Sequence, residues 1–287
     1  MQRTLKVLKF AVFGIVGLAV IAAAALFVRS EWILRKNYPS ELRGFESSVP
    51  DLVEGERLAR LRGCADGCHG PGNQGNVFID DWVMARVNAP NLTRVIPEYS
   101  DAELERLLRQ GVRKDGRSSL VMPSAMLSGL ADEDLALIVS YLRSLPPVDG
   151  PGRRLSVGPL ARVALSLGQF SPAAAEVQLN PPRTVPRDDP LAFGRYLART
   201  VCTECHGVDL GGNPMSGSPD LRITAAFGEE DFVRLMREGR GLEGRELGLM
   251  ADVAVGRFAH FTDEEIGALY AFLTDRASRP PAEAESD

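Results

Sequence analysis

Surplus basic charge is the first feature that this sequence lacks. Its 33 Lys and Arg residues are outnumbered by 38 Asp and Glu residues, which gives a formal net charge of −5 at pH 7. No basic cluster follows the N-terminal segment, so the electrostatic signature of a nucleic-acid-binding protein is missing and no nucleic-acid partner is expected. Strand-forming patterns are also nearly absent, which favours an all-α fold.

Histidine and cysteine are scarce, and most of them fall in two short stretches. The chain has three histidines and four cysteines. The cysteines form two close pairs with none left over, so disulfides are one interpretation for an exported chain. A histidine follows each pair, which argues against that interpretation. The two groups are Cys64, Cys68 and His69 in RGCADGCHG, and Cys202, Cys205 and His206 in CTECHG.

A long uncharged run stands near the N-terminus. Residues 10–28 carry no charge, and as a helix they span roughly 28 Å, about the hydrocarbon thickness of a bilayer. A cleaved signal peptide is the alternative, because basic residues precede the run and the alanines at 22–25 offer a cleavage site. The length of the run and the flanking Trp32 favour a retained membrane anchor.

The remaining chain contains a duplicated unit. Residues 100–117 match residues 228–245 at a constant offset of 128, and GERLARLRGC before the first cysteine group matches GRYLARTVC before the second. Each half therefore predicts a helix, the cysteine group, a loop, a middle helix, a loop and a terminal helix. Apolar residues recur at helical spacing in both terminal segments, 132–145 and 263–276. We expect two tandem all-α domains.

The segment between the halves is predicted to be a linker, because residues 145–190 hold nine of the 19 prolines. Its middle, residues 159–170, is apolar enough to form a short helix that docks on a neighbour or on a membrane surface. The proline-rich and acidic tail is expected to be disordered. The predicted units are the anchor or signal peptide 1–36, a connector 37–50, the first domain 51–147, the linker 148–189, the second domain 190–277 and the tail 278–287.

The second cysteine group has the C-x-x-C-H pattern of covalent haem attachment. Its thiols can add to the porphyrin vinyl groups while His206 supplies an imidazole to the iron, and both tasks need this tight spacing. A zinc site is the first alternative, but its second ligand pair normally comes from within about 20 residues. A thioredoxin-like redox pair needs a strand before the cysteines, whereas a helix is predicted here.

The two halves resemble class I c-type cytochrome domains. The resemblance rests on the cysteine groups, on APNLT at residues 89–93 and on the terminal helices, and it covers residues 51–147 and 190–277. It implies that the first and last helices of each domain cross where a glycine meets an aromatic residue. The pairs placed to do so are Gly55 with Tyr141, and Gly194 with Phe272.

The first cysteine group departs from the family pattern, because three residues rather than two separate Cys64 from Cys68. On a helix these positions lie one turn apart and share a face, so both thiols could reach the porphyrin after a small rotation. Cys68, His69 and Gly70 keep the usual junction. A second haem is therefore expected here, and whether Cys64 forms its own thioether stays open.

The number of histidines limits which residues can be the sixth ligands of the irons. With His69 and His206 as proximal ligands, one histidine remains, so two bis-histidine haems are impossible. Methionine is expected on the far side of the irons, where its soft thioether raises the potential. In the first half the resemblance favours Met122, and Met126 is the rival, with packing as its expected role.

In the second half Met250 has the matching place, although it lies three residues farther from the terminal helix than Met122 does. Met236 lies on the predicted middle helix and is expected in the core. His260 is the alternative ligand for the second iron.

The resemblance also predicts location and function. Haem attachment of this kind takes place outside the cytoplasm, which implies a single-pass protein of the inner membrane with both haem domains in the periplasm. Two irons closed by His and Met leave no open position for oxygen or peroxide, which predicts an electron-transfer protein rather than an enzyme. The expected cofactors are two covalently bound haem c groups.

The expected function is a membrane-tethered relay of single electrons, similar to the cytochrome subunits of membrane-bound dehydrogenases. The redox partner would be a dehydrogenase, an oxidase or a soluble cytochrome. A di-haem peroxidase is one alternative, with His260 as its only available distal histidine. The di-haem subunit of a terminal oxidase is the other.

Overall fold

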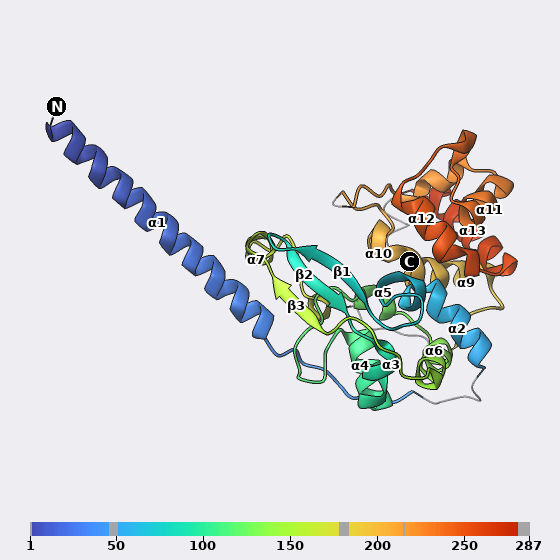
Figure 1. Ribbon diagram of the computed structural model, residues 1–287. Helices are drawn as coiled ribbons and strands as arrows, with labels where there is room; N and C mark the ends of the chain where they lie inside the picture. Colours follow the sequence, from blue (N-terminus) through green and yellow to red (C-terminus); the bar gives the residue numbers. More distant parts are fainter. Residues whose placement is uncertain (1, 46–50, 178–183, 215, 281–287) are drawn as a thin grey trace.

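The computed structural model describes residues 2–45, 51–177, 184–214 and 216–280. Helix α1 (Gln2–Arg35) stands away from the rest of the molecule (Figure 1). The stretch Lys6–Arg35 is long and apolar enough to cross a membrane, and its most apolar 18 residues have a mean hydropathy of 2.7. Part of the predicted connector, residues 46–50, and most of the predicted disordered tail, residues 281–287, lie outside the described residues.

The first repeated unit packs its helices around one apolar core. Helix α2 crosses the terminal helix α6 at Gly55, where a Cβ atom would collide with the carbonyl oxygen of Leu137 and lie 2.9 Å from Tyr141 Cβ. The glycine is needed for this close approach, as the resemblance implied. The helices are α2 (Leu52–Leu61), the irregular turn η1 (Cys64–Cys68), α3 (Leu92–Val95), η2 (Ile96–Glu98), α4 (Asp101–Gln110), α5 (Ser124–Leu127) and α6 (Asp132–Ser144).

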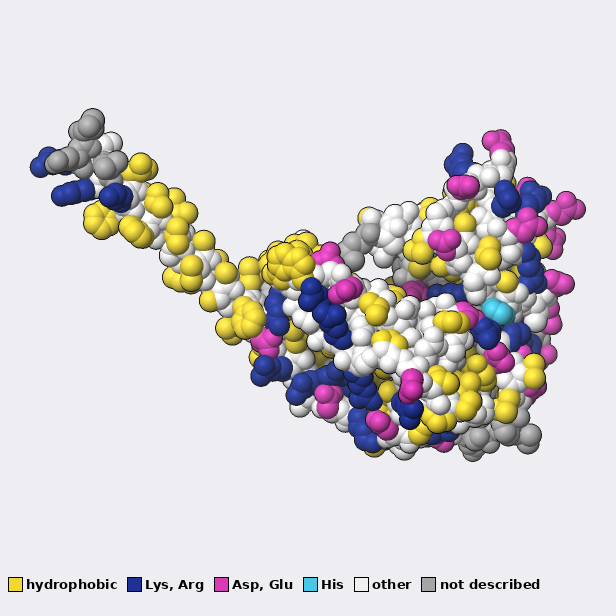
Figure 2. Space-filling view, in the orientation of Figure 1, with side chains coloured by type: hydrophobic (Ala, Val, Ile, Leu, Met, Phe, Trp, Pro, Cys, Tyr) yellow, Lys and Arg dark blue, Asp and Glu magenta, His cyan; other side chains and the backbone are white. Residues whose placement is uncertain are grey.

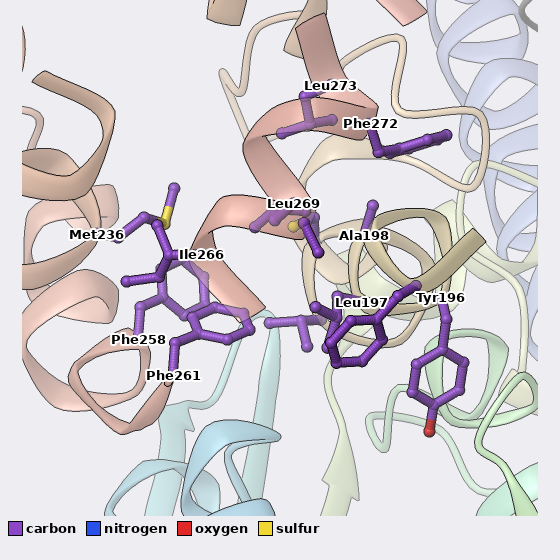
Figure 3. Close-up of a cluster of buried hydrophobic side chains, with 14 of the residues drawn as sticks. Tyr196, Leu197, Ala198, Met236, Phe258, Phe261, Ile266, Leu269, Phe272 and Leu273 are labelled. Atoms are coloured by element: carbon purple, nitrogen blue, oxygen red, sulfur yellow. The ribbon is translucent and has the colours of Figure 1, made fainter. Parts of the chain in front are cut away.

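The second unit repeats this arrangement. Helix α9 crosses α13 at Gly194, where a Cβ atom would collide with the carbonyl oxygen of Ala268 and lie 2.6 Å from Phe272 Cβ. Figure 3 shows Leu197 and Leu269 in the apolar cluster beside this crossing. The elements are α9 (Pro190–Leu197), η3 (Ala198–Cys202), α10 (Thr203–His206), η4 (Leu221–Ala226), α11 (Glu229–Glu238), η5 (Leu242–Gly244), α12 (Leu249–Gly256), η6 (Phe258–His260) and α13 (Asp263–Ser278).

The middle helices confirm the duplication. Helices α4 and α11 begin and end 128 residues apart, at the offset that the sequence match gives. Each ends at a glycine in the left-handed conformation, Gly111 with φ 68° and Gly239 with φ 69°. The expected fold class, two mostly helical domains behind an N-terminal apolar helix, is confirmed.

A three-stranded antiparallel sheet is the element that the sequence did not predict. Strands β1 (Asn76–Asp81) and β2 (Ala85–Ala89) form a hairpin, and β3 (Arg154–Val157) pairs with β2. The strands are short, and β1 and β3 are largely exposed, so they carry no apolar alternation for a sequence pattern to detect. The interdomain segment therefore contributes a strand as well as connecting the halves.

The expected short helix of this segment is present. Helix α7 (Pro159–Ser166) packs against the end of α1, where the Ser166 hydroxyl donates to the carbonyl oxygen of Leu26 at 2.8 Å. Helix α8 (Ala173–Glu176) follows and packs near α5.

The two domains share a buried polar contact. The Tyr196 hydroxyl of α9 donates to Asp134 Oδ2 of α6 at 2.7 Å, and the same carboxylate pairs with Arg62 at 2.8 Å. All three side chains are buried, so neither domain is complete at this surface without the other. In Figure 3 the hydroxyl of Tyr196 points away from the apolar cluster of the second domain.

Candidate haem-binding sites

The second cysteine group continues directly from a helix. Turn η3 runs into α10, which carries Cys205 and ends at His206. Cys202 is buried in the apolar core of the second domain, and this burial raises the pKa of its thiol to about 12. The pKa of Cys205 is raised for the same reason. Neither side chain is part of a disulfide.

The first cysteine group has a different backbone, which corrects the expectation of a shared helical face. Cys64 and Cys68 are not one turn apart on a helix, because Ala65 is extended, Asp66 is left-handed with φ 60°, and Gly67 has φ −97° and ψ −116°. The additional residue is accommodated as a loop. Both thiols are nevertheless drawn into the protein, and burial raises the pKa of Cys64 to about 11.

Both candidate proximal histidines are held in the same way. His69 Nδ1 lies 2.8 Å from the carbonyl oxygen of Pro90, and His206 Nδ1 lies 2.8 Å from that of Pro219. Because the carbonyl can only accept, Nδ1 carries the hydrogen and Nε2 keeps its lone pair for a metal. Burial lowers the pKa of both imidazoles, which favours this neutral form, although the carbonyl contact opposes the shift.

Each proline is followed by a helix cap that fixes its position. The side chain of Asn91 accepts from the backbone N–H of Thr93 at the start of α3, and Asp220 does the same for Arg222 at the start of η4. The APNLT stretch of the first half has a counterpart in the second half, SPDLR at residues 218–222, which was not predicted from the repeat. The shared pattern, proline followed by Asn or Asp and then leucine, was the available signal.

The difference in spacing between histidine and proline explains why the match was missed. Pro90 follows His69 by 21 residues, whereas Pro219 follows His206 by only 13. The β1–β2 hairpin, residues 76–89, lies within the longer interval.

The candidate methionine ligand of the first domain lies between α4 and α5. Met122 is half-buried against the apolar cluster that Cys64 also touches. Met126, on α5, is 2% exposed within that cluster, in keeping with its expected packing role. The assignment of Met122 as the iron ligand stays a prediction.

The candidate methionine of the second domain sits on a longer helix. Met250 is half-buried near the start of α12, against the cluster that contains Cys202. Helix α12 has eight residues, whereas α5 of the first domain has four, which accounts for the greater distance of Met250 from the terminal helix. Met236 is buried on α11, as expected for a core residue.

His260, the alternative ligand, lies at the seam between the domains. Its backbone carbonyl oxygen accepts from Arg57 Nη1 at 2.8 Å, and Arg57 also pairs with Glu265 at 2.8 Å. Burial, with Arg60 and Arg57 nearby, lowers the pKa of the imidazole. Arg57 and Arg60 belong to α2 of the first domain.

One arginine connects the two cysteine groups. Arg257 Nη1 pairs with Glu204 Oε2 at 2.8 Å, and Arg257 Nε donates to the carbonyl oxygen of Leu61 at 3.3 Å. A Cβ atom on Gly63 would lie 3.0 Å from the guanidinium carbon, so this glycine makes room for the side chain. Glu204 stands between the cysteines of the second group, and Gly63 precedes the first. The two cysteine groups therefore lie close together across the domain boundary.

The donors present suit an iron porphyrin. Each site offers two thiols, an imidazole with Nε2 left over and a nearby thioether, which together form the donor set of a c-type haem with His and Met ligands. A structural zinc ion would need four ligands. Within the described residues, no three His, Cys, Asp or Glu side chains converge to hold a metal ion.

The comparisons with known proteins agree with this donor set. The chain is 25% identical over 282 residues to the fructose dehydrogenase cytochrome subunit of Gluconobacter japonicus, covering 86% of this chain and 56% of that protein. It is 26% identical over 272 residues to the cytochrome c subunit of the quinone alcohol dehydrogenase of Gluconacetobacter polyoxogenes, covering 81% and 57%.

It is also 26% identical over 265 residues to the gluconate 2-dehydrogenase cytochrome c subunit of Pantoea cypripedii, covering 77% and 58%. The chain thus spans a little over half the length of these relatives. The family model of cytochrome c matches twice, over residues 52–146 and 191–276. Two repeated helical units, each with its own Cys–Cys–His group, account for the double match, and the chain belongs to the cytochrome c family.

Proposed function

We propose that this protein is a membrane-tethered di-haem cytochrome that passes single electrons through its two domains to or from a dehydrogenase. The observation that carries the proposal is the contact of Arg257 with both attachment sites, because it puts the two sites next to each other. When bound, haem c supplies an iron centre that takes up and gives away one electron.

The chain offers residues for holding two such groups. Cys202 and Cys205 would attach the second haem, and Cys68 would attach the first, with Cys64 available for a second thioether. His69 and His206 would bind iron through Nε2, because Pro90 and Pro219 occupy Nδ1. The sulfur atoms of Met122 and Met250 would supply the remaining ligands.

The apolar surroundings favour electron transfer over substrate chemistry. Leu58 and Leu135 are buried in the cluster next to Met122, and Phe258 is buried in the one next to Met250. Such walls exclude water, and His–Met coordination would leave an iron with no position for peroxide. His260 lies at the domain seam against Arg57, which gives the peroxidase alternative no support.

The partner and the location follow from the relatives and from α1. The relatives are cytochrome subunits of fructose, alcohol and gluconate dehydrogenases, so a membrane dehydrogenase is the proposed electron donor. Helix α1 is the proposed single membrane span, with the N-terminus in the cytoplasm and both haem domains in the periplasm. The uncharged length of α1 and its continuation as one helix to Arg35 support an anchor that is retained.

A spectroelectrochemical titration of the purified full-length protein tests this proposal. We expect two one-electron steps, low-spin spectra in both oxidation states, and no spectral change when carbon monoxide is added to the reduced protein. A high-spin component together with rapid peroxide turnover would contradict the relay and support the peroxidase alternative.

A further inference from the structure

Hydrophobic side chains gather where α1 meets the folded domains (Figure 2). We propose that the tip of the β1–β2 hairpin and one face of α7 insert into the interfacial layer of the same phospholipid bilayer that α1 spans. We call this surface the interfacial platform. The inference rests on the proposed membrane tether. The platform consists of Trp82, Met84, Leu160 and Leu167, whose side chains are 68%, 44%, 51% and 60% exposed.

The contacts between α7 and α1 fix the depth of the platform. The Ser166 hydroxyl donates to the carbonyl oxygen of Leu26, which lies inside the uncharged run 10–28. One turn back along α7, Arg162 pairs with Glu31 at 2.7 Å and donates to Ser30 Oγ at 2.9 Å. Helix α7 therefore lies beside the last turn of the uncharged run, with its C-terminal end nearer the membrane centre.

The positive charge of Arg162 at this contact is already paired. The Arg162 guanidinium also lies 4.6 Å from the ring centre of Phe27, which provides a cation–π contact in addition to the ion pair with Glu31. An arginine that is paired with a carboxylate can stay at the membrane boundary without leaving an unpaired charge in a low-dielectric layer.

The exposed face of α7 carries the apolar residues. Leu160 lies in the first turn of α7 and Leu167 caps its last turn; they are seven residues apart, which places them on one side of the helix. Where such a face enters the interfacial layer, it is held by the apolar area that it removes from water. The basic side chains Arg29, Arg35 and Lys36 are exposed at the end of α1, where lipid phosphates would lie.

The hairpin is attached to the other end of α7. The backbone N–H of Leu160 donates to the carbonyl oxygen of Val83 at 2.9 Å, and that of Gly158 donates to Met84 at 2.8 Å. Trp82 at the hairpin tip is therefore carried toward the headgroup region, where tryptophan is enriched in membrane proteins. The continuity of this surface with the membrane-spanning helix favours a lipid layer as its occupant over a protein.

Anchoring at two elements has a consequence for the haem domains. Strand β3 and the hairpin belong to the same sheet, and this sheet is attached to the first domain through β2. A platform that rests on the lipid would hold the first domain at a fixed orientation above the bilayer, whereas α1 alone would leave it free to rotate.

Photolabelling from the lipid phase tests the platform. The full-length haem-loaded protein is reconstituted into phosphatidylcholine–phosphatidylglycerol vesicles that contain a phosphatidylcholine with a diazirine near the headgroup end of one acyl chain. Labelled peptides are mapped by mass spectrometry. We expect label in α1, in residues 76–89 and in residues 159–170, several-fold above the label near Ile223, which is 51% exposed but lies in the second domain.

The variant W82S/L160E provides the matched test, because both side chains are exposed and their replacement leaves the core intact. It should lose the label in residues 159–170 while it retains the α1 label and the haem spectrum. The control variant I223E should leave all labelling unchanged.

The outcomes separate the two proposals. Label in α1 alone would overturn the platform and leave the membrane tether standing. No label in α1 would overturn the tether and the platform together. In native membranes, crosslinking of the platform to a protein in place of lipid would also overturn the inference.

Discussion

Arg257 and Glu204 form an ion pair of 2.8 Å at the point where the two cysteine groups meet. Arg257 comes from the second domain and reaches the backbone at Leu61 of the first, while Glu204 stands inside the second group. One guanidinium therefore lies close to both candidate haem sites.

The first prediction concerns this charge. Loss of a positive charge destabilises the reduced haem relative to the oxidised haem by about 1 kcal/mol. Arg257→Gln should therefore lower both midpoint potentials by roughly 40 mV, since one electron is transferred. Glu204→Gln should raise them, because it removes the opposite charge. Potentiometric titration gives both values. Arg234→Gln removes an exposed arginine that pairs with Asp231 and is the matched control; equal shifts in that variant would contradict the assignment.

The second prediction concerns the first sulfur ligand. Met122→Ala should remove half of the weak methionine-to-iron absorption of the ferric protein, because one of two thioethers is lost. Met126→Ala should leave that band intact but lower the free energy of unfolding by about 2–5 kcal/mol, since its buried side chain leaves a cavity. If Met126→Ala removes the band and Met122→Ala does not, the two assignments are reversed.

The third prediction concerns the second sulfur ligand. Met250→Ala should remove the remaining half of the band, while Met236→Ala, a buried substitution on α11, should act on stability alone. His260→Ala should leave the spectrum unchanged. A spectrum that changes in His260→Ala and is retained in Met250→Ala would identify histidine as the ligand.

The fourth prediction concerns the crossing of α9 and α13. Gly194→Ala should destabilise the second domain by about 3 kcal/mol or more, because the new Cβ collides with backbone that has little room to move. Gly267→Ala, on α13 itself, meets no atom within 4 Å and should stabilise the helix by about 0.5–1 kcal/mol. Guanidinium unfolding of the haem-loaded protein measures both free energies of unfolding. If Gly194→Ala destabilised the protein no more than Gly267→Ala does, the close crossing of α9 and α13 would be refuted.

The fifth prediction concerns the domain interface. Tyr196→Phe removes the hydroxyl that donates to Asp134 and accepts from the backbone N–H of Ala131, which should cost about 1–3 kcal/mol. It should also separate the unfolding of the two domains. Tyr270→Phe loses a contact to Phe227 within the second domain and should leave the coupling unchanged. A single shared transition in both variants would argue against coupling through Tyr196.

Local patterns predicted much of this structure. The cysteine groups and the duplicated helices depend on residues a few positions apart, so spacing alone identifies them. The close approaches at Gly55 and Gly194 join helices far apart in the sequence, and they were predicted only by the resemblance to c-type cytochromes.

Contacts between distant segments could not be predicted in this way. Strand β3 pairs with β2 although the paired residues are about 70 positions apart, and Arg257 reaches Leu61 from the second domain. The conformation at Asp66 and Gly67 was missed because helical spacing was assumed where the chain forms a loop. The match of Pro219 to Pro90 was missed because the β1–β2 hairpin lengthens the interval from His69 to Pro90 and has no counterpart among the described residues between His206 and Pro219.

The intact mass of the denatured, reduced full-length protein shows whether haem is covalently held at both cysteine groups. We expect a polypeptide that retains two iron porphyrins, and peptide mapping should place one on the Cys64–Cys68 segment and one on the Cys202–Cys205 segment. A mass that corresponds to a single porphyrin would contradict the two-site relay, and a mass equal to that of the bare chain would contradict covalent haem at either site.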